Sequence, residues 1–98
     1  MKLAEVFIAV KEQNLTKSQL EAYHTELTSL FAQMNLEMAE LEKEEAMFFL
    51  EKKEASDVAT KRAWRGTKEG QRLIELVRYS KATEKVLSSL KSRLYSTL

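Results

Sequence analysis

The sequence predicts an all-α fold, a long antiparallel two-helix hairpin of the coiled-coil type with a short helix before it. Three observations lead to this prediction. Apolar residues recur every seven residues over most of the chain, which is the repeat of packed helices. The 98 residues include no proline and only 2 glycines. Residues 1–57 carry 6 Lys and Arg against 12 Asp and Glu, whereas residues 58–98 carry 10 against 3, so an acidic helix can pair with a basic one.

Composition bounds the class of protein. A chain of 98 residues that is 44% hydrophobic and 32% charged suits one helical domain, which we place over residues 1–98. Because it has no cysteine, it cannot form disulfides or thiolate metal sites, and this agrees with a cytoplasmic location. The apolar residues 3–10 are too few to span a membrane and lack the cleavage site of a signal peptide. We therefore expect no membrane partner.

Helical spacing near the start of the chain predicts a short helix within residues 1–14. Its apolar residues fall at i, i+3, i+4 and i+7 and are Leu3, Val6, Phe7 and Val10. A strand over residues 6–10 is the alternative, but the sequence offers no convincing partner strand. Thr16 with Gln19 three residues later forms a capping-box pattern, so the next helix should begin at residue 17.

Heptad rows predict an acidic helix over residues 17–54 and a basic helix over residues 58–97. One row of the acidic helix consists of Leu20, Leu27, Met34, Leu41, Phe48 and Ala55. The rows of the basic helix consist of Leu73, Ser80, Leu87 and Leu94, and of Leu76, Thr83, Leu90 and Thr97. These rows form the seam along which the two helices should pack.

Two places could hold the turn of the hairpin. One is residues 55–57, where Ser56 or Asp57 can cap the following helix. The other is Gly66-Thr67. A turn near residue 56 is favoured because it gives two arms of nearly equal length, each about 57–60 Å at the rise of an α-helix.

A turn near residue 56 sets the pairing across the hairpin. The expected apolar pairs are Phe48 with Trp64, Leu41 with Leu73, and Met34 with Val77. The expected ion pairs are Glu40 with Arg72, Glu44 with Lys68, and Glu51 with Lys61. Each exposed ion pair is worth ~0.2–1 kcal/mol. Gly66 would lie within the basic helix, opposite the bulky side chains of residues 47–49.

Several apolar residues fall outside the seam and need a cover. They are Phe49, Leu50, Ile74, Tyr79, Val86 and Tyr95. The short first helix can cover one end of the hairpin. A second copy of the chain is the expected cover for the rest, which would give a homodimer in the form of a four-helix bundle.

One helix face of the basic half is a candidate binding site. Lys61, Arg65, Lys68 and Arg72 fall at i, i+4, i+7 and i+11, with Trp64 beside them. Such a stripe could bind phosphates or an acidic partner, and the indole could stack on a base. The simpler interpretation, which the sequence favours, is that the stripe pairs with glutamates of the acidic helix.

Catalysis is not expected. His24 is the only histidine and lies in the seam beside Leu20 and Leu27, where an interface role is expected. Glu-x-x-His spacing, which a di-iron bundle site needs, is absent from the sequence. No nucleophile–base pair, phosphate loop or metal motif is found. We therefore expect no enzyme activity, no metal and no cofactor.

The segment Trp64-Arg65-Gly66-Thr67-Lys68-Glu69-Gly70-Gln71 precedes a basic helix that contains Leu90-Lys91-Ser92-Arg93-Leu94. A T-x-E-G element before a basic helix that ends in LK-x-RL resembles small coiled-coil proteins of tailed bacteriophages, which are encoded near replication and recombination genes. The resemblance covers residues 55–95. It implies a DNA-transaction context in the cytoplasm of a bacterial host, and it brings no catalytic residues.

These observations together predict a non-enzymatic accessory protein that acts on a protein of DNA replication or recombination. Two alternatives stay open. The chain could bind DNA directly through the basic stripe, in which case its affinity would fall steeply with salt. It could instead be a phage inhibitor of a host nuclease or defence complex, which would form a stable one-to-one complex with its target.

Overall fold

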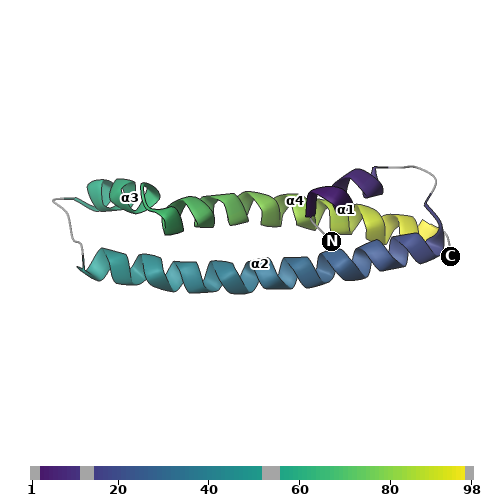
Figure 1. Cartoon of the computed structure of the whole chain (residues 1–98), viewed down its shortest axis with the longest axis horizontal. Coiled ribbons are helices and arrows are strands. Elements are labelled where there is room, and N and C mark those ends of the chain that lie inside the picture. Colours follow the sequence, from purple (N-terminus) through teal and green to yellow (C-terminus); the bar gives the residue numbers. More distant parts are fainter. Residues whose placement is uncertain (1–2, 12–14, 52–55, 97–98) are drawn as a thin grey trace. The chain divides into compact units, whose positions relative to one another are not determined.

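The computed structural model describes residues 3–11, 15–51 and 56–96. Within them the regular elements are four α-helices: α1 (Leu3–Val10), α2 (Lys17–Glu51), α3 (Asp57–Arg65) and α4 (Lys68–Ser96) (Figure 1). Helix α2 packs against α4 in a hairpin. The predicted all-α hairpin with a short N-terminal helix is therefore confirmed. The helix limits predicted at residues 1, 14, 54 and 97, and the heptad positions Ala55 and Thr97, lie outside the described residues.

Hydrogen bonds define the start of α2 at Lys17, as predicted, and the start of α3 at Asp57, one residue before the predicted position. At the start of α2, Thr16 N donates to Gln19 Oε1 at 2.9 Å and Gln19 N donates to Thr16 Oγ1 at 3.2 Å, which is a reciprocal capping box. At the start of α3, Ala59 N donates to Ser56 Oγ at 3.1 Å. Helix α2 ends at Glu51 and α3 begins at Asp57, so the chain reverses near residue 56, as the equal arms predict.

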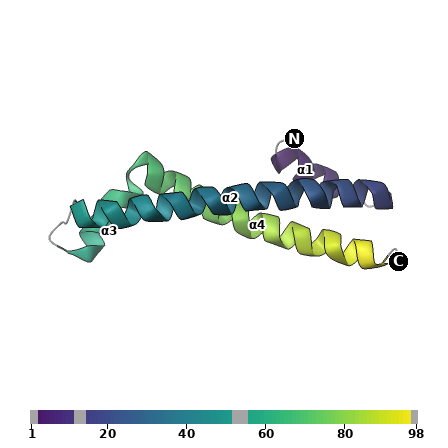
Figure 2. The ribbon, with the colours of Figure 1, turned by 90° about the horizontal axis from the view of Figure 1, so that it is seen from below.

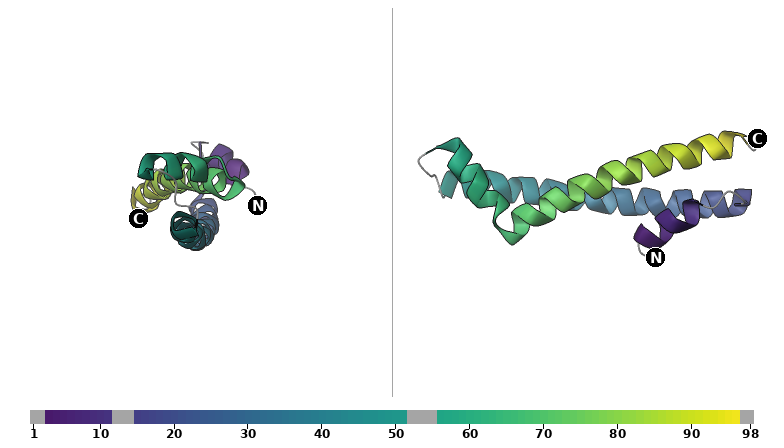
Figure 3. Two further views of the ribbon diagram at one scale, coloured as in Figure 1. Left: turned by 90° about the vertical axis from the view of Figure 1, so that its left-hand side faces the viewer. Right: turned by 90° about the horizontal axis from the view of Figure 1, so that it is seen from above.

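The single basic helix predicted over residues 58–97 is wrong, because the structure divides it into α3 and α4 at Gly66-Thr67. Gly66 caps α3 with its N–H directed at the carbonyls of Arg62 and Ala63, both at 3.2 Å. The two helices meet at an angle, which is clear in Figures 2 and 3. Both candidate turns are thus used, the first to reverse the chain and the second to bend the returning arm. Gly66 ends a helix and does not lie within one.

The described residues fall into two compact units. Unit 1 is made of residues within Met1–Gln33 and Ser80–Leu98. Its buried core joins α1, α2 and α4 and consists of Val6, Val10, Leu20, Leu27 and Leu90. Ser80 and Thr83, the polar members of the predicted heptad rows, are buried as well. The first helix therefore covers one stretch of the hairpin, as expected from its apolar face.

Unit 2 is made of residues within Met34–Tyr79 and has its own core. The buried residues are Leu41, Trp64, Leu73 and Leu76, with Met34, Met38, Phe48, Phe49 and Val77 packed against them. The predicted pair of Phe48 and Trp64 is confirmed, with ring centroids 5.5 Å apart. Leu41 and Leu73 share this core, as do Met34 and Val77.

Candidate functional site: the basic elbow of α3 and α4

The junction of α3 and α4, both in unit 2, is built by local hydrogen bonds. Thr67 Oγ1 donates to Trp64 O at 2.6 Å and accepts from Gly70 N at 2.9 Å, so it caps α4 while holding the end of α3. Gln71 Nε2 donates to Arg65 O at 2.5 Å. These bonds link the first turn of α4 to the last turn of α3, so the bend between the helices has a defined geometry.

Gly70 makes this bend sterically specific. A Cβ built at Gly70 would lie 2.0 Å from Trp64 O and 2.8 Å from Trp64 C, which is too close for any side chain. The backbone of α4 can approach the end of α3 only because residue 70 is glycine. The T-x-E-G element quoted above therefore has a structural meaning here: its threonine caps α4 and its glycine permits close contact with α3.

Trp64 does not lie where the base-stacking interpretation needs it. The side chain is 4% exposed and packs in the core of unit 2 against Phe48. An indole with no accessible face cannot stack on a base from solution. Trp64 is thus a core residue that anchors α3, and its expected role beside the basic stripe is corrected.

The four predicted cations do not form one continuous stripe, because the helix breaks between them. Lys61 and Arg65 belong to α3, and Lys68 and Arg72 belong to α4. All four side chains are exposed. The spacing i, i+4, i+7 and i+11 places residues on one face only where the helix is continuous, so the predicted stripe is divided between two helices at the bend.

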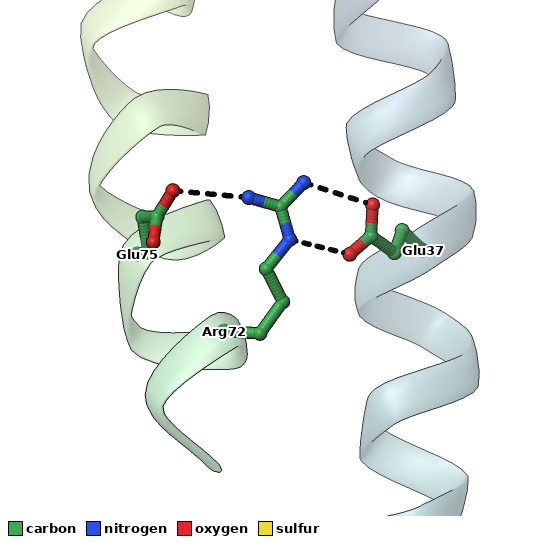
Figure 4. A network of polar contacts seen from close by, with 3 residues as sticks. All are labelled: Glu37, Arg72 and Glu75. Carbon is green, nitrogen blue, oxygen red and sulfur yellow. Dashed lines mark hydrogen bonds and ion pairs between the residues drawn. The ribbon is translucent and has the colours of Figure 1, made fainter. Parts of the chain in front are cut away.

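Arg72 differs from the other three cations because it is held in an ion-pair network. Its Nε lies 2.6 Å from Glu37 Oε2, its Nη2 lies 3.1 Å from Glu37 Oε1, and its Nη1 lies 3.0 Å from Glu75 Oε1 (Figure 4). The hydrogen bonds from Arg72 lower the pKa of Glu37, and the bond with Glu37 raises the pKa of Arg72. Arg72 therefore acts as a bidentate clamp between α2 and α4.

The ion pairs predicted from the pairing of two straight helices are wrong in their partners. Arg72 pairs with Glu37 rather than Glu40, one helical turn away. Among the described residues, no ion pair joins Glu44 to Lys68 or Glu51 to Lys61. The bend at Gly66 changes the direction of the returning arm, so a pairing rule for two straight helices does not hold across it. Lys61, Arg65 and Lys68 consequently stay directed to solvent.

Sequence reasoning missed two residues of this surface. They are Val58 and Arg62, both on α3. One face of α3 holds the positions i, i+3, i+4 and i+7, which are Val58, Lys61, Arg62 and Arg65. Val58 is 68% exposed. We call the exposed cations Lys61, Arg62, Arg65 and Lys68 the basic elbow. The helical spacing within residues 58–65 was the signal that could have placed Arg62 and Val58 with Lys61 and Arg65.

The described residues were also searched for metal-ligand groups and for membrane-spanning helices. They contain no group of three His, Asp or Glu side chains placed to hold a metal ion. His24 lies half-buried in α2. A search of the same residues for a helix long and apolar enough to cross a bilayer finds none.

The fold and this surface define the chain as an all-α helical hairpin with a bent second arm and a basic elbow. Comparison with known proteins adds nothing to this description, because no family model, curated protein or solved structure matches the chain.

Proposed function

We propose that the protein is a non-enzymatic helical interaction module that binds an acidic surface of a protein of DNA replication or recombination through its basic elbow. The observation that carries this proposal concerns three exposed cations, Lys61, Arg65 and Lys68. Among the described residues, they make no ion pair with the acidic helix α2. Cations that took no part in the fold would be available to a partner. The bacteriophage setting and the bacterial cytoplasm rest on the sequence resemblance alone.

The chemistry of the elbow suits a protein partner. On α3, the exposed Val58 shares one helix face with three exposed cations, Lys61, Arg62 and Arg65, and an apolar residue next to polar and charged groups is a usual arrangement at protein interfaces. The hydrogen-bonded, closely packed junction at Thr67 and Gly70 presents these groups on a defined backbone, which lowers the ordering cost of binding.

The test compares two variants of the full chain that lose equal charge. The elbow variant carries Lys61→Gln, Arg65→Gln and Lys68→Gln. The control variant carries Arg78→Gln, Lys81→Gln and Lys91→Gln, three exposed positions of α4. Each is used to capture proteins from nuclease-treated bacterial extract. We expect one protein to be retained by the wild type and the control and lost with the elbow variant. Retention that is equal in all three would contradict the proposal.

Direct DNA binding is the second candidate, and the same exposed cations support it. Each phosphate contact that is lost should flatten the dependence of log affinity on log salt by roughly 0.7–0.9. Gel retardation of single- and double-stranded DNA at low salt distinguishes the two functions. Retardation by the wild type but not by the elbow variant would favour DNA, whereas no retardation would leave the protein partner. An inhibitor of a host nuclease or defence complex would appear in the capture experiment as a stable one-to-one complex.

A further inference from the structure

Unit 2 carries an apolar face that nothing in the described residues covers. Leu36, Met47 and Leu50 on α2 are 69%, 57% and 83% exposed. They are spaced at i, i+11 and i+14, close to three and four full turns, so they lie on one face of the helix. The buried Leu41 is five residues from Leu36 and points to the other side, into the core. Met47 and Leu50 are three residues apart and form an exposed apolar pair, and Leu36 lies about 16 Å further along the same face. Adjoining exposed apolar side chains on one helix face are a candidate interaction surface.

Three carboxylates border this row on one side. Glu40, Glu44 and Glu51 are exposed and lie within one turn of the apolar residues. Lys43, four residues before Met47, also lies in the face, and its aliphatic stem can lie along apolar surface while its ammonium group reaches outward. We call Leu36, Met47, Leu50, Glu40, Glu44 and Glu51 the acidic face. Its occupant should be apolar and basic.

Unit 1 holds a surface of that kind. A groove of about 350 Å³ lies between α1 and α4, with Phe7, Val10 and Val86 among its apolar lining residues. The lining also includes three cations, Lys11, Lys85 and Arg93. Arg93 Nη1 donates to Val10 O at 2.7 Å and so ties the two walls together. We call these six residues the basic groove.

We infer that two copies of this chain associate by placing the acidic face of α2 from one copy in the basic groove of the other. Apolar side chains bordered by three carboxylates on one surface match an apolar lining with the exposed cations Lys11 and Lys85 on the other. Self-pairing of either surface is disfavoured because it would bring like charges together. Each copy carries both surfaces, so a copy can contact another copy through its acidic face, through its basic groove, or through both.

Charge reversal on each surface tests this contact. The face variant carries Glu40→Lys and Glu44→Lys, and the groove variant carries Lys11→Glu and Lys85→Glu. Sedimentation should show the wild type associating above the 11.3 kDa of one chain, and each variant alone should associate at least about tenfold more weakly. An equimolar mixture of the two variants should recover the association, because lysines of one then meet glutamates of the other in both contacts.

Controls separate lost contact from lost fold. Glu42→Lys on α2 and Lys91→Glu on α4 reverse exposed charges outside the two surfaces, and they should associate like the wild type. Circular dichroism should give the same helix content for all variants. A monomeric wild type, association of the face or groove variant alone at wild-type strength, or a mixture that stays monomeric would each overturn the inference.

The outcome is independent of the function proposed above, because neither surface contains a cation of the basic elbow. The elbow variant should therefore associate with itself as the wild type does. Loss of self-association in that variant would place the copy-to-copy contact at the elbow and would contradict the assignment to the acidic face and the basic groove.

Discussion

The backbone of Gly70 lies against the carbonyl group of Trp64, so closely that a Cβ at residue 70 would come within 2.0 Å of the Trp64 oxygen. This contact joins the first turn of α4 to the end of α3, and Thr67 secures it with hydrogen bonds to both residues. The position of the elbow cations depends on it, since Lys61 and Arg65 lie before the junction and Lys68 after it.

Gly70→Ala should therefore destabilise the protein. The atoms that the new methyl group would meet belong to the backbone and cannot rotate away, so α4 must shift, at a cost of about 1–3 kcal/mol. The measurement is the free energy of unfolding from urea titration. Gly66→Ala is the matched control: its Cβ would meet Ala63 O at an ordinary 3.4 Å and its φ is −80°. Alanine there should be neutral or stabilising by up to about 1 kcal/mol. Equal effects at the two positions would contradict this account of the junction.

The buried state of Trp64 predicts its fluorescence. Iodide should quench the emission of the native protein far less than that of the urea-unfolded chain, and added DNA should leave it unchanged because no ring face is accessible. Phe48→Ala should make the indole more accessible to iodide and should lower the free energy of unfolding by up to about 3 kcal/mol, because the partner ring at 5.5 Å is lost. Strong quenching of the wild type by single-stranded DNA would show that Trp64 leaves the core to stack.

The pair of Glu37 and Arg72 predicts a pH dependence of stability. The pKa of Glu37 is lowered in the folded state by the hydrogen bonds from Arg72. Its stabilisation is thus complete above the ordinary value of 4.5 and is lost as the pH falls through the lowered pKa. Both side chains are more than two-fifths exposed, so solvent screening limits the contribution to ~0.2–1 kcal/mol.

Unfolding measured at pH 7 and pH 3 checks this prediction. Glu37→Gln should be less stable than the wild type at pH 7, and the difference should shrink at pH 3. Glu40→Gln is the control, measured at a protein concentration too low for self-association because Glu40 belongs to the acidic face. Glu40 is the partner expected from the straight-helix pairing, but it makes no ion pair with Arg72 in the structure. A pH-dependent loss at Glu40 that equals the loss at Glu37 would show that the straight-helix pairing holds in solution.

Comparison of sequence and structure shows which features local patterns could predict. The capping box of Thr16 and Gln19, the Ser56 cap and the heptad rows were predictable because each depends on residues a few positions apart. The pairing of Phe48 with Trp64 followed from one turn position. The break at Gly66 was recognised only as an alternative turn, because the sequence contains no proline there and the close contact of Gly70 with Trp64 is a tertiary feature.

The same break explains why the candidate site was predicted only in part. The positions of Lys61, Arg65 and Lys68 on the surface followed from their charge. The separation of these cations onto two helices and the burial of Trp64 depend on the bend at Gly66, which helix periodicity over residues 58–97 could not supply. Arg62 and Val58 share a face with Lys61 by their spacing alone, and the exposure of Val58 had to come from the structure. The ion pair of Arg72 shifted by one turn for the same reason.

The central claim is that the cations of the elbow are not needed for the fold and are available to a partner. Its most direct test is the free energy of unfolding at pH 7 of the variant with Lys61→Gln, Arg65→Gln and Lys68→Gln, measured beside Arg72→Gln. We predict a change within about 0.5 kcal/mol for the triple variant, as for surface positions without partners, and a loss of up to about 1 kcal/mol for Arg72→Gln, which removes an ion pair. A triple variant that loses more stability than Arg72→Gln would show that these cations hold the hairpin together, and would contradict the account.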